Sequence, residues 1–160
     1  MKYLWCTVGT KTYTYFGFGE LTGSRPLPYY NFTEAYVQAA IEVNKFILAN
    51  GADTHLHNNN PGYWTLRPAN TNVEIWVQSS VGVMTYGILQ SALSGLTVAA
   101  ANYNKANYPM VFQINDGEWG EVGIGYAGIL DSNGQCYYRL AADATNACQY
   151  VSNGWVKGFN

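Results

Sequence analysis

The feature that most constrains this chain is a long uncharged stretch near its middle. No charged residue occurs between Glu74 and Lys105. Such a run has to be tested as a membrane span, because about 20 apolar residues cross a bilayer. This one is interrupted throughout by Gln, Ser, Thr and Asn, which disfavours a constitutive span. We expect instead a helix over 80–103 that is buried nearly all round.

The composition agrees with a folded, charge-poor domain. The chain has 160 residues, of which 11% are charged, under half of the roughly 25% that is usual in soluble domains. This length predicts a single globular domain over residues 1–160. The eight Lys and Arg residues are scattered, so they form no stripe that could neutralise phosphates, and we expect no nucleic-acid partner.

Capping and periodicity predict another helix over 32–50. Asn31 and Glu34 have the spacing of a capping box. Apolar residues then recur three and four positions apart and form one face. The sequence Asn50-Gly51 supplies a stop, because Gly accepts the left-handed conformation that ends many helices.

The remaining segments have the patterns of strands and tight turns. Alternating apolar and polar residues fill 3–20, 63–77 and 108–130, and Asn115-Asp-Gly117 has the composition of a hairpin turn. We therefore predict an α+β, two-layer domain, in which an antiparallel sheet of about five or more strands packs on the two helices.

One motif resembles a phosphate-binding loop. Gly123 to Gly128 reads G-x-G-x-x-G, but the phosphate-binding version opens a helix, whereas this one lies in a strand pattern that ends at the turn Asp131-Ser-Asn-Gly134. Glycines inside a strand indicate a close approach of backbones or a bulge. We expect no cofactor.

Two sets of residues could carry chemistry. Asp53, His55 and His57 alternate, so an extended backbone would point them the same way, as a weak metal or catalytic set. Glu118 and Glu121 flank a turn beside a Trp, and paired carboxylates can hydrolyse a glycoside. Histidines in such a loop are often only solvated, and acidic residues often only keep an exposed turn soluble. A role without chemistry therefore stays open for both sets.

Several features favour an extracellular protein. Cys136 and Cys148 flank a polar stretch and are expected to form a disulfide, while Cys6 lies in an apolar run and is expected to be buried. Asn31-Phe-Thr33 is a glycosylation sequon. The first residues do not read as a signal peptide, so the secreted form is expected to be a mature chain.

Aromatic residues exceed what one small core can hold. The chain has 14 Tyr, 5 Trp and 6 Phe, and Tyr and Trp are favoured at binding surfaces. The candidates for a binding surface are Tyr63, Trp64, Trp119, Tyr126, Tyr137 and Tyr138.

The abundance of Tyr, Asn and Gly, the low charge and the Cys-flanked loop resemble the small secreted α/β proteins of fungi, effectors and killer-toxin-like proteins among them. The resemblance is one of kind, covers no alignable stretch and transfers no functional residue. Such proteins usually have several disulfides, and this chain has only three cysteines.

Three functions follow as hypotheses. The first is a secreted, non-enzymatic interaction protein of that effector or toxin type, with an aromatic surface for a protein or carbohydrate target. The second is a small secreted hydrolase that uses the Asp/His/His set or the paired carboxylates. The third is a membrane-active toxin in which the uncharged helix 80–102 is released at a bilayer. The oligomeric state is not predicted.

Overall fold

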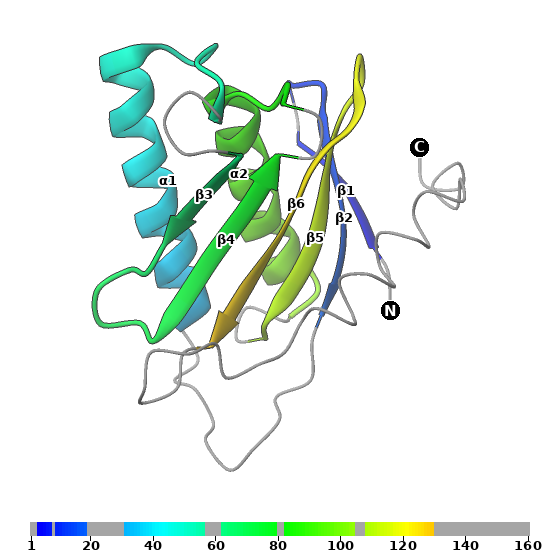
Figure 1. Ribbon diagram of the computed structural model, residues 1–160. Helices are drawn as coiled ribbons and strands as arrows, with labels where there is room; N and C mark the ends of the chain where they lie inside the picture. Colours follow the sequence, from blue (N-terminus) through cyan, green and yellow to red (C-terminus); the bar gives the residue numbers. More distant parts are fainter. Residues whose placement is uncertain are drawn as a thin grey trace.

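The chain forms two layers in the computed structural model, a sheet and a pair of helices (Figure 1). The structure describes residues 3–7, 9–18, 31–56, 62–79, 82–104 and 108–129. Its elements in chain order are β1 (Tyr3–Cys6), β2 (Thr12–Phe18), α1 (Asn31–Asn50), β3 (Tyr63–Leu66), β4 (Val73–Ser79), α2 (Tyr86–Asn102), β5 (Met110–Asp116) and β6 (Gly120–Ile129). The predicted α+β architecture, an antiparallel sheet with two helices packed on it, is confirmed.

All six strands belong to one antiparallel sheet in the order β1-β2-β5-β6-β4-β3. Three hairpins, β1–β2, β3–β4 and β5–β6, supply the local pairings, and the turn predicted at Asn115-Asp-Gly117 connects the last of them. The helices make the long connections, because α1 links β2 to β3 at the far edge and α2 links β4 to β5 across β6. Both helices lie on the same face, which we call the inner face of the sheet (Figure 1); the opposite face is the outer face.

The ends of the helices follow their capping residues. α1 ends before Gly51, which has a φ of 93° and whose amide donates to the Ile47 carbonyl at 2.7 Å. The predicted start of α2 at residue 80 is wrong. Ser79 is the last residue of β4, and the Thr85 hydroxyl instead caps the helix by accepting from the Ile88 amide at 3.2 Å. The chain from Ile75 to the end of α2 has no charged residue, so hydropathy alone did not mark the boundary between strand and helix.

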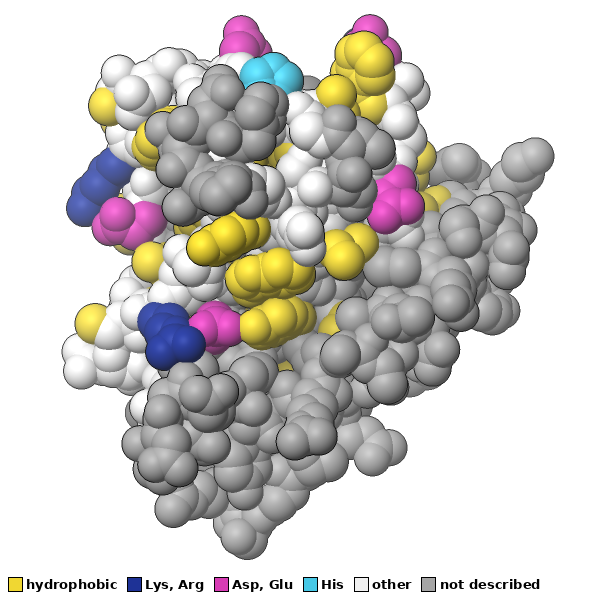
Figure 2. All heavy atoms as spheres, viewed as in Figure 1, with side chains coloured by type: hydrophobic (Ala, Val, Ile, Leu, Met, Phe, Trp, Pro, Cys, Tyr) yellow, Lys and Arg dark blue, Asp and Glu magenta, His cyan; other side chains and the backbone are white. Residues whose placement is uncertain are grey.

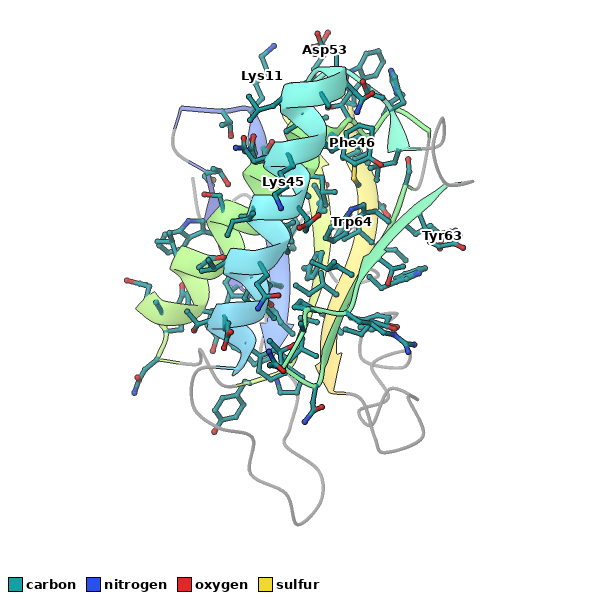
Figure 3. All side chains as sticks on the ribbon, turned by 90° about the vertical axis from the view of Figure 1, so that its left-hand side faces the viewer. Lys11, Lys45, Phe46, Asp53, Tyr63 and Trp64 are labelled. Atoms are coloured by element: carbon teal, nitrogen blue, oxygen red, sulfur yellow. The ribbon has the colours of Figure 1, made fainter. Side chains whose placement is uncertain are left out.

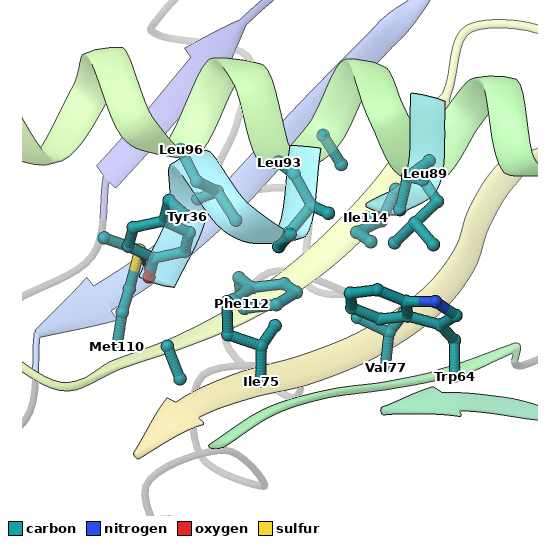
Figure 4. Close-up of a cluster of buried hydrophobic side chains, with 14 of the residues drawn as sticks. Tyr36, Trp64, Ile75, Val77, Leu89, Leu93, Leu96, Met110, Phe112 and Ile114 are labelled. Carbon is teal, nitrogen blue, oxygen red and sulfur yellow. Dashed lines mark hydrogen bonds between the residues drawn. The ribbon is translucent and has the colours of Figure 1, made fainter. Parts of the chain in front are cut away.

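The core lies between the helices and the inner face (Figure 4). The leucines of α2 are buried, because they meet the sheet on one side and α1 on the other. Ser94 and Val98 are exposed, so the expectation of a helix buried nearly all round is wrong. Tyr36 of α1 is fully enclosed, its hydroxyl lies 3.8 Å from the Met110 sulfur, and burial raises its pKa. The largest buried side chains are Tyr36, Phe16, Phe32, Phe112, Leu56, Ile75, Met84, Leu89, Leu93, Leu96, Met110 and Ile114.

The outer face of β1 and β2 has a smaller apolar cluster of its own. Leu4 and Tyr15 are buried there, and Tyr13 packs against them. Burial, with smaller contributions from Tyr13 and Cys6, raises the pKa of Tyr15 to about 12.

The G-x-G-x-x-G motif lies inside β6 and not at the start of a helix. A Cβ on Gly125 would lie 2.4 Å from the Trp76 carbonyl oxygen and 2.6 Å from the Phe112 ring. These distances are shorter than any real Cβ contact, so Gly125 is required by the close approach of its neighbours. The interpretation of these glycines as strand residues in close packing is confirmed.

Gly125→Ala should therefore destabilise the fold. Overpacking usually costs about 1–3 kcal/mol, and the backbone oxygen of Trp76 cannot move as a side chain would, so we expect the upper part of that range. The free energy of unfolding in urea, followed by tryptophan fluorescence, measures the effect. Gly117→Ala is the control, because a Cβ there has no neighbour closer than 3.6 Å. Equal stability of the two variants would contradict the packing described.

A second prediction concerns Thr14, which is fully buried on the inner face and whose hydroxyl has no hydrogen-bond partner among the described residues. Thr14→Val keeps the shape and removes the unpaired polar group, so stability should be unchanged or rise by about 1 kcal/mol. Thr71→Val is the matched control, because the Thr71 hydroxyl donates to the Pro68 carbonyl at 2.8 Å and accepts from the Val73 amide at 3.2 Å. Denaturant titration should show a loss for Thr71→Val alone.

Candidate binding surface

Three aromatic side chains gather on the outer face at the β3 end of the sheet. Tyr63 lies on β3, Trp76 on β4 and Tyr126 on β6, and side chains alternate between the two faces along each strand. Trp76 is directly paired with Tyr126, and Tyr63 is paired with Gln78, two residues along β4 from Trp76. The rings of Trp76 and Tyr126 are stacked, with centroids 5.6 Å apart and planes 22° apart. The result is a row of aromatic side chains across three strands.

Neighbouring residues on β3 point to opposite sides of the sheet (Figure 3). Tyr63 points away from the helices and is 39% exposed, whereas Trp64 points between the layers and is 9% exposed. Trp64 packs in the core and does not form part of the surface. Of the two adjacent aromatic candidates, only Tyr63 can meet a ligand on the outer face.

A nearly buried carboxylate lies beside the aromatic row. Glu74 is 9% exposed, and burial of a charge is costly unless the charge is paired. The Arg67 Nε donates to Glu74 Oε2 at 2.7 Å, and the Tyr126 hydroxyl donates to Glu74 Oε1. Glu74 therefore holds one aromatic ring of the row and one cation in fixed positions. We call Tyr63, Arg67, Glu74, Trp76 and Tyr126 the outer aromatic cluster.

The space-filling view from the outer side shows the arrangement at the surface (Figure 2). Hydrophobic side chains lie in a row over the β3-β4-β6 part of the sheet, with a basic and an acidic side chain together at one end of the row. Trp76 and Tyr126 are partly buried, and the Arg67 side chain is 55% exposed. Among the described residues, the cluster therefore combines the exposed Tyr63 and Arg67 with two partly buried rings and the nearly buried Glu74.

The other predicted aromatic candidates lie apart from this cluster. Trp119 is 60% exposed at the β5–β6 turn, directly before the first residue of β6, whereas Tyr126 lies towards the other end of that strand. Tyr137 and Tyr138 lie outside the described residues. Trp119 is therefore an exposed ring apart from the outer aromatic cluster.

The proposed Asp/His/His set is not gathered into a site by the described residues. Asp53 is exposed in the connection after α1 (Figure 3), and the His55 Nδ1 lies 3.2 Å from the Gly82 carbonyl oxygen. His57 lies outside the described residues. Within the described ranges, no group of three His, Cys, Asp or Glu side chains could hold a metal ion.

The carboxylates at the β5–β6 turn act locally. The buried Asp116 accepts the amides of Glu118 at 2.8 Å and Trp119 at 3.3 Å through Oδ1, which closes the turn. Glu118 is exposed and pairs with Lys11 at 3.6 Å, a type of contact that contributes little to stability. Glu121 is half-buried at the start of β6. Hairpin geometry accounts for Asp116, and the catalytic role of Glu118 and Glu121 stays a prediction.

The features linked to secretion fall mostly beyond the described part. Cys136 and Cys148 lie outside it, and no disulfide is found among the described residues. Cys6 is free and exposed, so its predicted burial is wrong. It is the last residue of the edge strand β1 and points to the outer face, away from the core. Asn31, the residue of the sequon, begins α1.

Comparisons with known proteins do not assign the chain to a family: no family model matches it, and no curated protein or solved structure matches it either. The site must therefore be interpreted from its own geometry.

Sequence reasoning identified Tyr63 and Tyr126 but missed Arg67, Glu74 and Trp76. The signal was present, because strict alternation in Val73-Glu-Ile-Trp-Val77 places Glu74 and Trp76 on one face and three aliphatic residues on the other. What alternation could not supply is the register that sets Trp76 against Tyr126 and places Arg67 beside Glu74.

Tyr126→Phe tests the contact that organises the cluster. It removes the donor to Glu74 Oε1 while keeping the ring, and loss of a hydrogen bond to a nearly buried charged group costs about 1–3 kcal/mol. The free energy of unfolding should fall by that amount. Tyr63→Phe, a change on an exposed ring, should stay within about 0.5 kcal/mol of the wild type. If Tyr126→Phe were equally neutral, Glu74 would not depend on this hydroxyl.

Proposed function

We propose that the protein is a small secreted, non-enzymatic interaction protein that binds an extracellular target through the outer aromatic cluster. The finer proposal, suggested by composition, is that it belongs to the effector or killer-toxin-like type of fungal protein. The observation that carries the binding proposal is the row of Tyr63, Trp76 and Tyr126 on an open sheet face, locked by the Arg67–Glu74 pair.

The residue types favour a binding role. Trp, Tyr and Arg are the residues that contribute most of the energy at binding surfaces, because they offer large rigid contact area with polar groups at the edge. The antiparallel sheet needs only one covered face, so fold stability does not require three aromatic side chains on the other. A binding function would explain why aromatic side chains occur on this outer face.

The cluster is also pre-organised. Trp76 and Tyr126 stack on each other, and Tyr126 and Arg67 both donate to Glu74. Side chains that are fixed before binding lose less conformational entropy when a ligand arrives. This supports direct binding by the cluster as it stands.

The alternatives have weaker support in the geometry. A hydrolase would need reactive carboxylates or histidines brought together, and Asp116 and Glu118 are engaged in the turn and with Lys11. A membrane-active toxin would have to expose α2, whose leucines are buried in the core. Among the described residues, no helix is long and apolar enough to cross a membrane.

Trp76→Ala tests the proposal. The wild-type protein should be retained by at least one preparation of extracellular material, polysaccharide or protein, in a sedimentation assay. Loss of the central ring should weaken retention about tenfold, because aromatic contacts contribute on the order of 1 kcal/mol or more. Trp119→Ala should bind as the wild type does.

Thermal unfolding of both variants checks that the fold is intact, and Tyr63→Ala provides a second test on a more exposed ring. Unchanged retention of both Trp76→Ala and Tyr63→Ala would refute the proposed surface. Release of soluble products that stopped on Glu118→Gln or Glu121→Gln would instead favour the hydrolase.

A further inference from the structure

The outer aromatic cluster is balanced in charge. Its one carboxylate, Glu74, is paired with its one cation, Arg67, at 2.7 Å. The next residue along β4 on the same face, Gln78, is neutral and exposed. A ligand with a formal charge would find no uncompensated counter-charge in this cluster, whereas a neutral ligand with many hydroxyl groups would find both donors and acceptors.

We propose that the ligand of this surface is a neutral polysaccharide, whose apolar ring faces pack on the outward side of the Trp76–Tyr126 pair and on Tyr63, and whose hydroxyl groups bond to the exposed Arg67 and Gln78. This inference rests on the proposed binding function and names its ligand class. The chemistry of both partners is amphipathic: a sugar ring combines a C–H face with a rim of hydroxyls, and the cluster combines aromatic rings with a polar end.

The polar groups have capacity left for such a ligand. Glu74 is nearly buried and accepts from Arg67 and Tyr126, so its role is to hold these two side chains in place. Arg67 uses Nε for Glu74, while its side chain is 55% exposed, so the terminal N–H groups of its guanidinium can donate outward. Exposed Gln78 adds an amide, which can both donate and accept.

The layout suits an extended chain. The row crosses three neighbouring strands, and strands lie about 4.8 Å apart. The stacked Trp76–Tyr126 pair and the Tyr63 ring lie along one line across these strands, over which an extended chain can run.

A protein partner fits this cluster less well. Stable protein interfaces bury roughly 800 Å² on each side, and of the five side chains of the cluster only Tyr63 and Arg67 are exposed. Polysaccharides bind through a few stacked units, so this smaller surface is sufficient for them. A protein ligand is nevertheless an outcome that the experiment must separate.

Affinity electrophoresis of the full chain provides the test. Native gels would contain laminarin, galactomannan or xyloglucan as neutral polysaccharides and polygalacturonate as an anionic one. We expect retardation by at least one neutral polymer, none by polygalacturonate, and little effect of salt. Trp76→Ala and Tyr63→Ala should each weaken the retardation about tenfold, and Trp119→Ala should not.

Arg67→Gln and Glu74→Gln extend the test to the polar end. Both leave the rings in place and should reduce retardation in the neutral gel, with the fold checked by thermal unfolding. Retardation by polygalacturonate alone, or neutral retardation that survives in both Trp76→Ala and Tyr63→Ala, would overturn the inference.

The two proposals fail differently. If no neutral polymer retards the wild type, but a purified extracellular protein such as collagen sediments it in a Trp76-dependent manner, the polysaccharide inference falls and the binding surface stands. If no ligand, polysaccharide or protein, depends on Trp76 or Tyr63, both fall.

Discussion

The fold depends on burying one face of a six-stranded sheet under two helices. α2 can serve this purpose because it has no charged residue, so its leucines can contact the sheet and α1 at once without burying an unpaired charge. An antiparallel sheet tolerates exposure of its other face. This one-sided burial is what leaves Tyr63, Trp76 and Tyr126 on an open surface.

The inner packing and the outer cluster are physically linked through β6. Gly125 allows the Phe112 ring and the Trp76 backbone to approach from neighbouring strands. The next residue, Tyr126, points to the opposite face and stacks on the Trp76 side chain. A side chain at Gly125 would force the strands or Phe112 to shift, and the aromatic pair on the other face would shift with them. The glycine of the core is therefore also a requirement of the surface.

The sequence predicted those parts of the fold that are determined locally. Alternation marked the strands, Asn115-Asp-Gly117 marked the β5–β6 hairpin, and Asn31, Glu34 and Gly51 marked α1. The start of α2 was wrong because Ser79 and Thr85 are both acceptable caps, and only the pairing of Ser79 in β4 decides between them. Likewise, alternation places the rings of Tyr63 and Trp64 on opposite sides of the sheet. Which of the two rings is buried depends on the register between β3 and β4.

The outer aromatic cluster depends on such non-local register even more strongly. Arg67 and Glu74 come together because the β3–β4 hairpin turns between them, whereas Tyr126 reaches the same carboxylate from a strand 52 positions away. Glu74 is also the last charged residue before the uncharged stretch. The low charge that allows α2 to be buried thus has a second consequence: the outer cluster holds a single ion pair, satisfied from within, beside neutral aromatic rings. A surface of this kind discriminates against charged ligands, because their desolvation is not compensated by a counter-charge. The desolvation cost of accepting hydroxyl groups is small by comparison.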